Sequence, residues 1–235
     1  MAYDECKLSK FVDDFLIDNI NNMSSDFIKN QYNIMKLSIN DYFPIQNNIT
    51  FKKLKIDEIS RYSITLPKKA DDISKIIQTY CYNFNKPIII TDGTAGVGGN
   101  VLSFCKHGFI VNAVEIDKDR YECLLNNIKE YNYNILSSHN CDYLEKFDRI
   151  KQDVIFIDPP WGGLDYKKND NITIKLGNIN IETLCNKIIE KQLAKLTVLK
   201  LPYNYNLNYI KNVIYLPFTI FKLKNILLVI IFNSN

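Results

Sequence analysis

The sequence predicts an α/β fold in which a mostly parallel sheet carries helices on both faces. Short apolar runs alternate with amphipathic segments over most of the chain after residue 70, which is the pattern of a doubly wound sheet. A glycine-rich turn, TDGTAGVGGN at 91–100, joins the first predicted strand to a helix. The early predicted strands also run into acidic residues at their carboxyl ends.

The composition suits one α/β domain with a sizeable core and a small appendage, since 46% of the 235 residues are apolar. The formal net charge of +3 permits an anionic partner but does not require one. No apolar run reaches membrane-span length, and the N-terminus lacks the basic-then-apolar order of a signal peptide, so an intracellular protein is expected. The six cysteines form no CxxC pair and both histidines stand alone, which favours free thiols and no metal site.

Residues 1–60 are polar and irregular in pattern, and they predict a small, mainly helical N-terminal lobe. Phe11, Phe15 and Ile20 have helical spacing within the segment 11–20. Residues 61–235 carry the regular pattern and are expected to form the second, larger domain.

The core helices are predicted from apolar residues at helical spacing. Ile73, Ile77 and Tyr80 fall on one face of a segment that opens with two aspartates. Gly108 closes the next helix, and Leu124 lies on the inward face of the third. The helices are expected at 71–84, 99–108, 120–131 and 180–189.

The strands are predicted from short apolar runs such as PIIITD, DVIFID and NILLVIIF, which are bounded by polar or turn residues. Because helices connect the early strands, those strands should be parallel, with their carboxyl ends at one edge of the sheet. The strands are expected at 87–92, 109–117, 153–158, 195–202, 212–218 and 225–232, and residues 134–144 should form the third strand with its exit loop.

The glycine-rich turn lets the backbone approach a ligand, while the following helix points its free amides at that ligand. The second strand ends in Glu115, where such folds use an acid to accept hydrogen bonds from both ribose hydroxyls. Asp92 at the mouth of the turn would repel a pyrophosphate but suits a cationic or zwitterionic cofactor such as S-adenosylmethionine. Asp142, after the third strand, could accept from an adenine amino group.

The segment VIFIDPPWGGLDY at 154–166 places the only tryptophan on a stiff turn after the fourth strand. The two prolines fix the backbone, so local carbonyls and Asp158 can hold both hydrogens of an exocyclic amino group. Trp161 would stack on the base that carries the amine, and such stacking is worth about 1–3 kcal/mol. A cationic base such as 7-methylguanine would add about 0.5–2 kcal/mol. The alternative is that Trp161 is a core residue packed after a strand.

Together these motifs resemble the trimethylguanosine synthases, S-adenosylmethionine-dependent methyltransferases that modify N2 of a 7-methylguanosine RNA cap. TDGTAGVGGN, VNAVEID, HNCDY and DPPWGGLDY stand where the family reads DAFCGVGGN, AIDID, GDF and SPPWGGPDY. RYSITLP at 61–67 resembles WFSVTPE, and LKLPYN at 199–204 resembles YFLPRN. The resemblance implies a Rossmann-like class I methyltransferase with a seven-stranded sheet.

The resemblance also implies roles for individual residues. Asp158, Pro159 and Trp161 would be catalytic, because they would meet the cap base and its amine. The cofactor would be bound by Asp92, Gly93, Thr94, Gly96, Glu115, Ile116, Asp142, Tyr143 and Asp158. The cap would be bound by Trp161, Ser63, Thr65 and Asn204. A monomer that acts on capped RNA or a 7-methylguanosine cap nucleotide, in the nucleus or cytoplasm, is expected.

Departures from the family pattern leave two alternatives open. Asp158 replaces a serine, and acid-first DPP turns also occur in methyltransferases that act on adenine N6 or on guanine N2 of ribosomal RNA. Tyr203 replaces an arginine, and Arg61 replaces a tryptophan. The second hypothesis is therefore an amino-group methyltransferase on internal RNA or DNA. The third is a catalytically silent methyltransferase fold that binds caps, although the intact acids at the strand ends argue against it.

Overall fold

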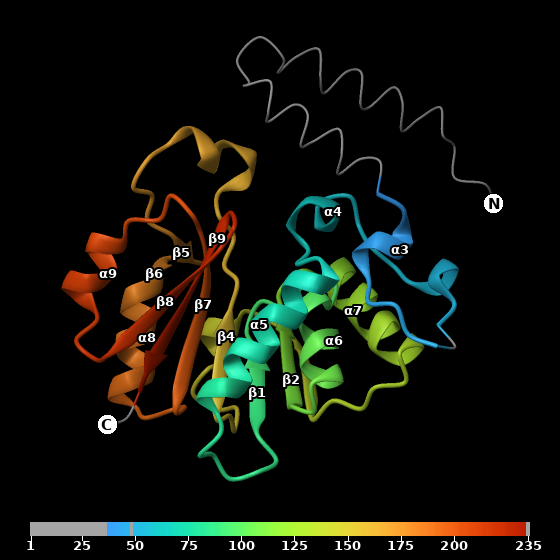
Figure 1. The fold of residues 1–235 in the computed structure, drawn as a ribbon, viewed down its shortest axis with the longest axis horizontal. Helices are drawn as coiled ribbons and strands as arrows, with labels where there is room; N and C mark the ends of the chain where they lie inside the picture. The colour runs from blue at the N-terminus through green and yellow to red at the C-terminus, as the bar shows by residue number, and fades with distance from the viewer. Residues whose placement is uncertain (1–36, 48, 234–235) are drawn as a thin grey trace. The chain divides into compact units, whose positions relative to one another are not determined.

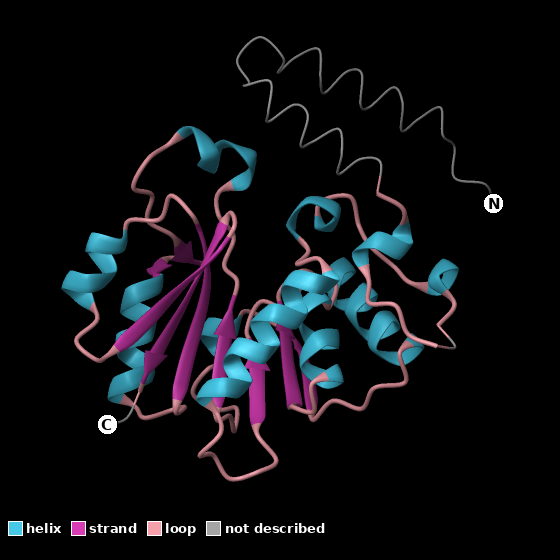
Figure 2. Ribbon diagram, viewed as in Figure 1, coloured by secondary structure: helices cyan, strands magenta, loops and turns pink. Residues whose placement is uncertain are grey.

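A seven-stranded sheet lies at the centre of the computed structural model, which describes residues 37–47 and 49–233 (Figures 1 and 2). The first five strands in sheet order are parallel, and β9 runs antiparallel to both of its neighbours. In sheet order the strands are β3 (Ser137–Asn140), β2 (Ile110–Glu115), β1 (Ile89–Asp92), β4 (Val154–Ile157), β7 (Leu196–Pro202), β9 (Ile226–Phe232) and β8 (Phe218–Leu223). This confirms the predicted mostly parallel, seven-stranded sheet.

The strand order reverses between β1 and β4. From β1 the chain proceeds outward through β2 to β3, and then returns to place β4 on the other side of β1. At such a switch point the connections leave in opposite directions, so a crevice opens at the carboxyl ends of the two strands. The carboxyl ends of β1 and β4 carry Asp92, Asp158 and the two turns that the sequence singled out.

Helices cover both faces of the sheet. On one face, Phe104 of α6 (Gly99–Lys106) meets Phe156 of β4 edge to face, with ring centroids 5.2 Å apart. On the other face, α8 (Ile181–Glu190) and α9 (Leu207–Val213) pack in one apolar cluster with Ile155 and Ile157 of β4. Phe156 thus contacts one layer of helices, and Ile155 and Ile157 contact the other, because successive residues of a strand point to opposite faces.

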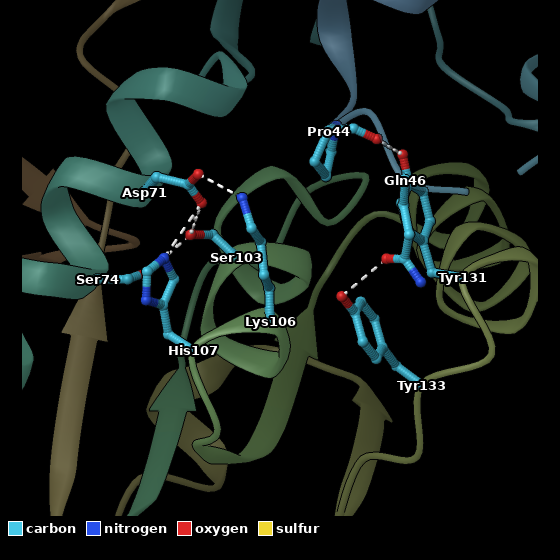
Figure 3. Close-up of polar contacts among 9 residues, drawn as sticks. All are labelled: Pro44, Gln46, Asp71, Ser74, Ser103, Lys106, His107, Tyr131 and Tyr133. Carbon is cyan, nitrogen blue, oxygen red and sulfur yellow. Dashed lines mark hydrogen bonds and ion pairs between the residues drawn. The ribbon is translucent and has the colours of Figure 1, made fainter.

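Helix α5 (Pro67–Tyr80) begins four residues before the predicted start at 71, because Pro67 occupies the first turn, where its missing N–H is not needed. Asp71 therefore lies inside the helix and faces α6. Its Oδ2 accepts from Lys106 Nζ at 2.6 Å and its Oδ1 accepts from Ser103 Oγ at 3.0 Å (Figure 3). Ser74 and Ser103 share a further buried hydrogen bond of 2.7 Å.

The segment that precedes α5 packs on the end of α7 (Lys118–Glu130). The Tyr131 hydroxyl donates to the Pro44 carbonyl, and the Tyr133 hydroxyl donates to Gln46 Oε1 at 3.1 Å (Figure 3). Short helical turns occur here: α3 (Ile39–Tyr42), η2 (Phe51–Lys53) and α4 (Ser60–Ser63). The described residues from Ile39 onward form one compact unit. The helix expected at 11–20 lies outside the described residues, and a separate lobe of residues 1–60 stays a prediction.

The strand predicted at 212–218 is wrong. Val213 ends α9, a loop follows, and β8 begins only at Phe218. Asn206 starts the helix by accepting a hydrogen bond from Tyr209 N at 3.2 Å, and Pro217 cannot donate to a strand ladder. The apolar run at 212–218 therefore belongs to a helix end and a strand start. Besides α9, four shorter elements after residue 140 have no counterpart in the sequence prediction: η3 (Tyr143–Glu145), η4 (Gly163–Lys168), β5 (Lys175–Leu176) and β6 (Ile179–Asn180).

Candidate functional site

Four acids meet at the carboxyl edge of the sheet, as the sequence predicts. Asp92 ends β1 and Glu115 ends β2, whereas Asp142 lies two residues after β3 and Asp158 follows β4 directly. Because these strands are parallel neighbours, their ends lie side by side. The arrangement gathers four carboxyl groups at one edge of the sheet.

The glycine-rich turn is held against β2 by the Glu115 carboxylate. Its two oxygens accept from the Gly96 amide at 2.7 Å and from the Asp117 amide at 2.9 Å. Each carboxylate oxygen has two lone pairs, so Glu115 can still accept from a ligand hydroxyl while it holds the turn. Asn140, which the sequence did not single out, donates to the carbonyls of Glu115 and Ile116 and fixes the backbone beside the acid.

Gly93 is a glycine because Tyr143 packs directly against it. A Cβ at position 93 would lie 2.8 Å from the Tyr143 ring, which is closer than any side chain can tolerate. Tyr143 itself is only 2% exposed, and its hydroxyl donates to Gln152 Oε1 at 3.4 Å. Tyr143 therefore supports the turn from within the core.

Asp92 carries an unused acceptor in a buried position. Its Oδ1 accepts from the Thr94 amide at 3.1 Å, but its Oδ2 has no hydrogen-bond partner among the described residues. Burial raises the pKa of Asp92 to about 8, against the hydrogen bond from Thr94, and the carboxylates of Asp158 and Glu115 add to the rise. A buried carboxylate oxygen without a donor is costly, so this position suits the cationic groups of S-adenosylmethionine.

An apolar side chain and two acceptors flank the glycine-rich turn. Ile116 is 66% exposed, which is unusual for an isoleucine that directly follows a buried strand end. Asp142 Oδ1 accepts from the Leu144 amide at 2.9 Å. Ile116 can cover the face of a nucleoside base, while Glu115 and Asp142 offer acceptors. The residues present therefore fit an adenosine group.

The tryptophan turn is folded back by two glycines. Gly162 and Gly163 have φ values of +90° and +75°, which side chains other than glycine rarely adopt. The reversal brings Tyr166 against Trp161 edge to face, with ring centroids 5.2 Å apart. Trp161 is half-buried and packs against the apolar cluster of α8 and α9. Its Nε1 has no hydrogen-bond partner in the described part of the chain.

Thr94 joins the glycine-rich turn to the tryptophan turn. Its hydroxyl accepts from the Asp158 amide at 2.8 Å, and its own amide donates to Asp92. Pro159, which follows Asp158, is buried. The start of the tryptophan turn is thus fixed relative to the end of β1.

The sequence prediction missed Lys200, which lies on β7 beside Asp158. The register pairs Ile157 with Leu199, so the next residues on the two parallel strands are neighbours. Lys200 Nζ lies 2.5 Å from Asp158 Oδ2 and 5.1 Å from the centroid of the Trp161 ring. The signal in the sequence was the single lysine inside the apolar run LTVLKLP at 196–202, since a buried lysine almost always has a partner.

The three remaining predicted cap-binding residues differ in position. Ser63 is exposed, and its hydroxyl donates to the Ile59 carbonyl at 3.3 Å. Thr65 is buried and accepts from Asn100 Nδ2 at 3.1 Å, next to the start of α6. Asn204 Nδ2 donates to the carbonyls of Tyr166 and Asn169, at 2.7 and 2.6 Å. Asn204 therefore holds the loop after Trp161.

Other features of the described residues lie outside this site. A hollow of about 700 Å³, lined in part by Gln152, Lys195 and Tyr215, opens at the amino-terminal edge of β4 and β7, opposite the acids. Within residues 37–47 and 49–233, no group of three or more His, Cys, Asp or Glu side chains could hold a metal ion. None of the helices described has the length and apolar character needed to cross a membrane.

The sheet order and the acidic strand ends define the fold of class I S-adenosylmethionine-dependent methyltransferases. A 16S rRNA guanine-N2 methyltransferase of Thermus thermophilus, solved with S-adenosylmethionine and guanosine, has a TM-score of 0.53 and 13% identity. That similarity covers 76% of this chain and 43% of the other. An O-methyltransferase of Thermotoga maritima has a TM-score of 0.53 and 13% identity, over 74% of this chain and 68% of the other.

The chain belongs to the RNA cap guanine-N2 methyltransferase family, whose model matches residues 88–229. S-adenosylmethionine is the methyl donor of this family, so the predicted family, fold class and cofactor are confirmed. An uncharacterised protein of Acanthamoeba polyphaga mimivirus is 36% identical over 189 residues, which are 71% of this chain and 74% of that protein.

Two trimethylguanosine synthases are weaker matches. The Schizosaccharomyces pombe enzyme is 31% identical over 120 residues, and the Saccharomyces cerevisiae enzyme is 25% identical over 201 residues. The matches cover 47% and 74% of this chain, but only 47% and 63% of the two enzymes. The findings therefore identify an S-adenosylmethionine-dependent RNA methyltransferase of the guanine-N2 type.

Proposed function

We propose that this protein transfers a methyl group to the exocyclic N2 of a 7-methylguanosine RNA cap. The observation that carries the proposal is the position of Asp158 and Trp161 on one rigid turn beside the buried, unpartnered oxygen of Asp92. Thr94 ties that turn to the glycine-rich turn through the Asp158 amide. An amine acceptor and a base-stacking ring thus lie next to the residues that suit the cofactor.

The cofactor residues of this proposal are those of the first three strand ends. Asp92 and the glycine-rich turn would hold the amino-acid end, Glu115 the ribose hydroxyls, and Ile116 with Asp142 the adenine. When bound, S-adenosylmethionine supplies a methyl group from its cationic sulfur. The demethylated cofactor then leaves as a neutral thioether. Tyr143 has a supporting role in this scheme, because it lies beneath Gly93.

The chain's own residues orient the acceptor amine. The Asp158 carboxylate and the carbonyls of the proline turn accept the two amine hydrogens, which points the nitrogen lone pair away from them. As the nitrogen–carbon bond forms, the amine carries one surplus proton, and Asp158 or solvent takes it. Such alignment can lower a barrier by several kcal/mol, on the order of 7–11 in the best cases. No further general base is required.

Methyl transfer from labelled S-adenosylmethionine tests the proposal. We expect transfer to 7-methyl-GTP and not to GTP, with mass spectrometry locating the new methyl groups on N2. Transfer to uncapped RNA but never to 7-methyl-GTP would replace the proposal with its alternative, an amino-group methyltransferase on internal RNA or DNA. The acid-first turn at Asp158 is the observation that favours this alternative. Cap binding without cofactor uptake, measured by calorimetry, would indicate a catalytically silent cap-binding fold.

The proposed partner is capped RNA or a 7-methylguanosine cap nucleotide, and the proposed site of action is the nucleus or cytoplasm. A monomer suffices for the scheme, because each proposed site residue comes from one chain. Size-exclusion chromatography with light scattering tests the oligomeric state directly.

A further inference from the structure

Lys200 is a buried cation that has no role in the mechanism proposed above. Its side chain is 6% exposed, within a strand whose other residues are buried. Moving an ammonium group out of water costs several kcal/mol unless an acid lies in hydrogen-bonding contact with it. Asp158 supplies that contact at 2.5 Å, and its own side chain is 16% exposed.

The ammonium group of Lys200 contacts both of the groups assigned to the acceptor base. It bonds to the carboxylate that would receive the amine hydrogens, and it lies 5.1 Å from the centroid of the ring on which the base would stack. A cation at this distance from an indole is attracted to it by about 0.5–2 kcal/mol. One side chain therefore restricts the movement of both Asp158 and Trp161.

The charged surroundings of Asp158 give Lys200 a second effect. Among the described residues, Lys200 on β7, Lys69 on α5, Asp92 on β1 and the Tyr166 hydroxyl on η4 interact with this carboxylate. Burial raises the pKa of Asp158, whereas the charge and hydrogen bond of Lys200, and then the charge of Lys69, oppose the rise. Lys69 Nζ itself donates to Asn225 Oδ1 at 2.8 Å, so Lys200 is the direct partner.

We propose that Lys200 is a positioning residue of the acceptor site, which fixes the Asp158 carboxylate toward the amine and the Trp161 ring beneath the base. The role rests on the proposed function for the identity of the base. Lys200 itself need not touch the substrate, because it acts through the two residues that do.

Fluorescence of Trp161 tests the ion pair without any acceptor substrate. Trp161 is the only tryptophan of the chain, so its emission, excited at 295 nm, reports protonation of the neighbouring carboxylate. In protein saturated with S-adenosylhomocysteine, we expect an acidic transition that Asp158→Asn removes. Lys200→Met should move its midpoint up by about one pH unit or more, whereas Lys200→Arg should stay near the wild type. An unchanged midpoint in Lys200→Met would overturn the proposal.

Methyl transfer to 7-methyl-GTP tests the positioning role. We expect Lys200→Met to lower kcat/KM at least tenfold and to move the acidic limb of the pH profile upward with the fluorescence midpoint. In the Asp158→Asn background the same substitution should cost less than threefold, because the pair acts as a unit. Losses that simply multiply would contradict the role.

Two controls separate the outcomes. Melting temperature and S-adenosylhomocysteine affinity show whether Lys200→Met is folded, and Asp158→Ser combined with Lys200→Phe supplies a neutral pair at the two positions if it is not. If wild-type protein does not methylate 7-methyl-GTP, the proposed function fails, while the fluorescence titration still decides whether Lys200 controls Asp158.

Discussion

The two halves of the site are built differently. In the cofactor half, residues 89–145, the acids accept hydrogen bonds from backbone amides of nearby turns, as Glu115 does from Gly96 and Asp117. In the acceptor half, residues 154–206, the contacts run between side chains and segments far apart in sequence, as in the pair of Asp158 with Lys200. In the half proposed to bind the cofactor, backbone amides therefore hold the acids, whereas in the half proposed to bind the acceptor base a distant side chain holds Asp158.

The largest expected effect concerns Asp92 in the cofactor half. Its folded pKa of about 8 lies above the usual value of 3.8. Between these values the folded state keeps a proton that the unfolded state has lost, so stability falls as pH rises from about 4 to about 8. The loss is on the order of several kcal/mol, or roughly 10 °C in melting temperature. Asp92→Asn should remove it.

Thermal melts of the ligand-free protein between pH 5 and pH 8.5 check this prediction. The relevant quantity is the difference between wild type and Asp92→Asn, because other groups titrate equally in both. A difference that does not grow with pH would show that Asp92 is ionised in the folded protein.

The next effect separates the halves through Glu115. Glu115→Ala should weaken S-adenosylmethionine binding about 10–100-fold, because a hydrogen bond to a charged group is worth about 1.5–3 kcal/mol. Affinity for 7-methyl-GTP, measured by calorimetry without cofactor, should change less than threefold. Equal losses for both ligands would indicate that the two halves are not independent.

The matching substitution in the acceptor half is Trp161→Ala. Affinity for 7-methyl-GTP should fall at least tenfold, consistent with the roughly 1–3 kcal/mol of base stacking. Affinity for S-adenosylmethionine should stay nearly constant, which makes Glu115→Ala and Trp161→Ala controls for each other. Unchanged cap affinity would mean that Trp161 serves only the packing against Tyr166 and the core.

The smallest expected effect tests whether Thr65 stabilises the fold or binds the cap. Thr65→Val removes the hydroxyl that accepts from Asn100, which should cost about 1 kcal/mol and lower the melting temperature by about 2–4 °C. Ser63→Ala, at an exposed position, should leave stability unchanged. A larger loss of cap affinity in Thr65→Val than in Ser63→Ala, without a change in melting temperature, would instead make Thr65 a cap ligand.

The sequence was sufficient to predict those features that depend on residues close together in the chain. The glycine-rich turn, the acids at the strand ends and six of the seven strands follow from local pattern, because parallel strands with helical connections must bring their carboxyl ends to one edge. The same local reasoning failed at 212–218, where apolar spacing fits a helix end and a strand start equally well.

The acceptor half was harder to predict because its partners are distant in sequence. The pairing of Lys200 with Asp158 depends on β4 lying beside β7, which only the sheet order determines. Asn204 holds the loop after Trp161 through carbonyls about 35 residues earlier, and no local pattern announces such a bond. The role of Tyr143 depends on its packing beneath Gly93, which is a matter of three-dimensional shape.

Thr94 fixes the distance between the glycine-rich turn and the tryptophan turn. With its amide on Asp92 and its hydroxyl on the Asp158 amide, a single residue sets the separation of the two turns. Neither turn can slide without breaking a bond to the other. The spacing between the turn proposed for the cofactor and the turn proposed for the acceptor therefore depends on the contacts of one short side chain.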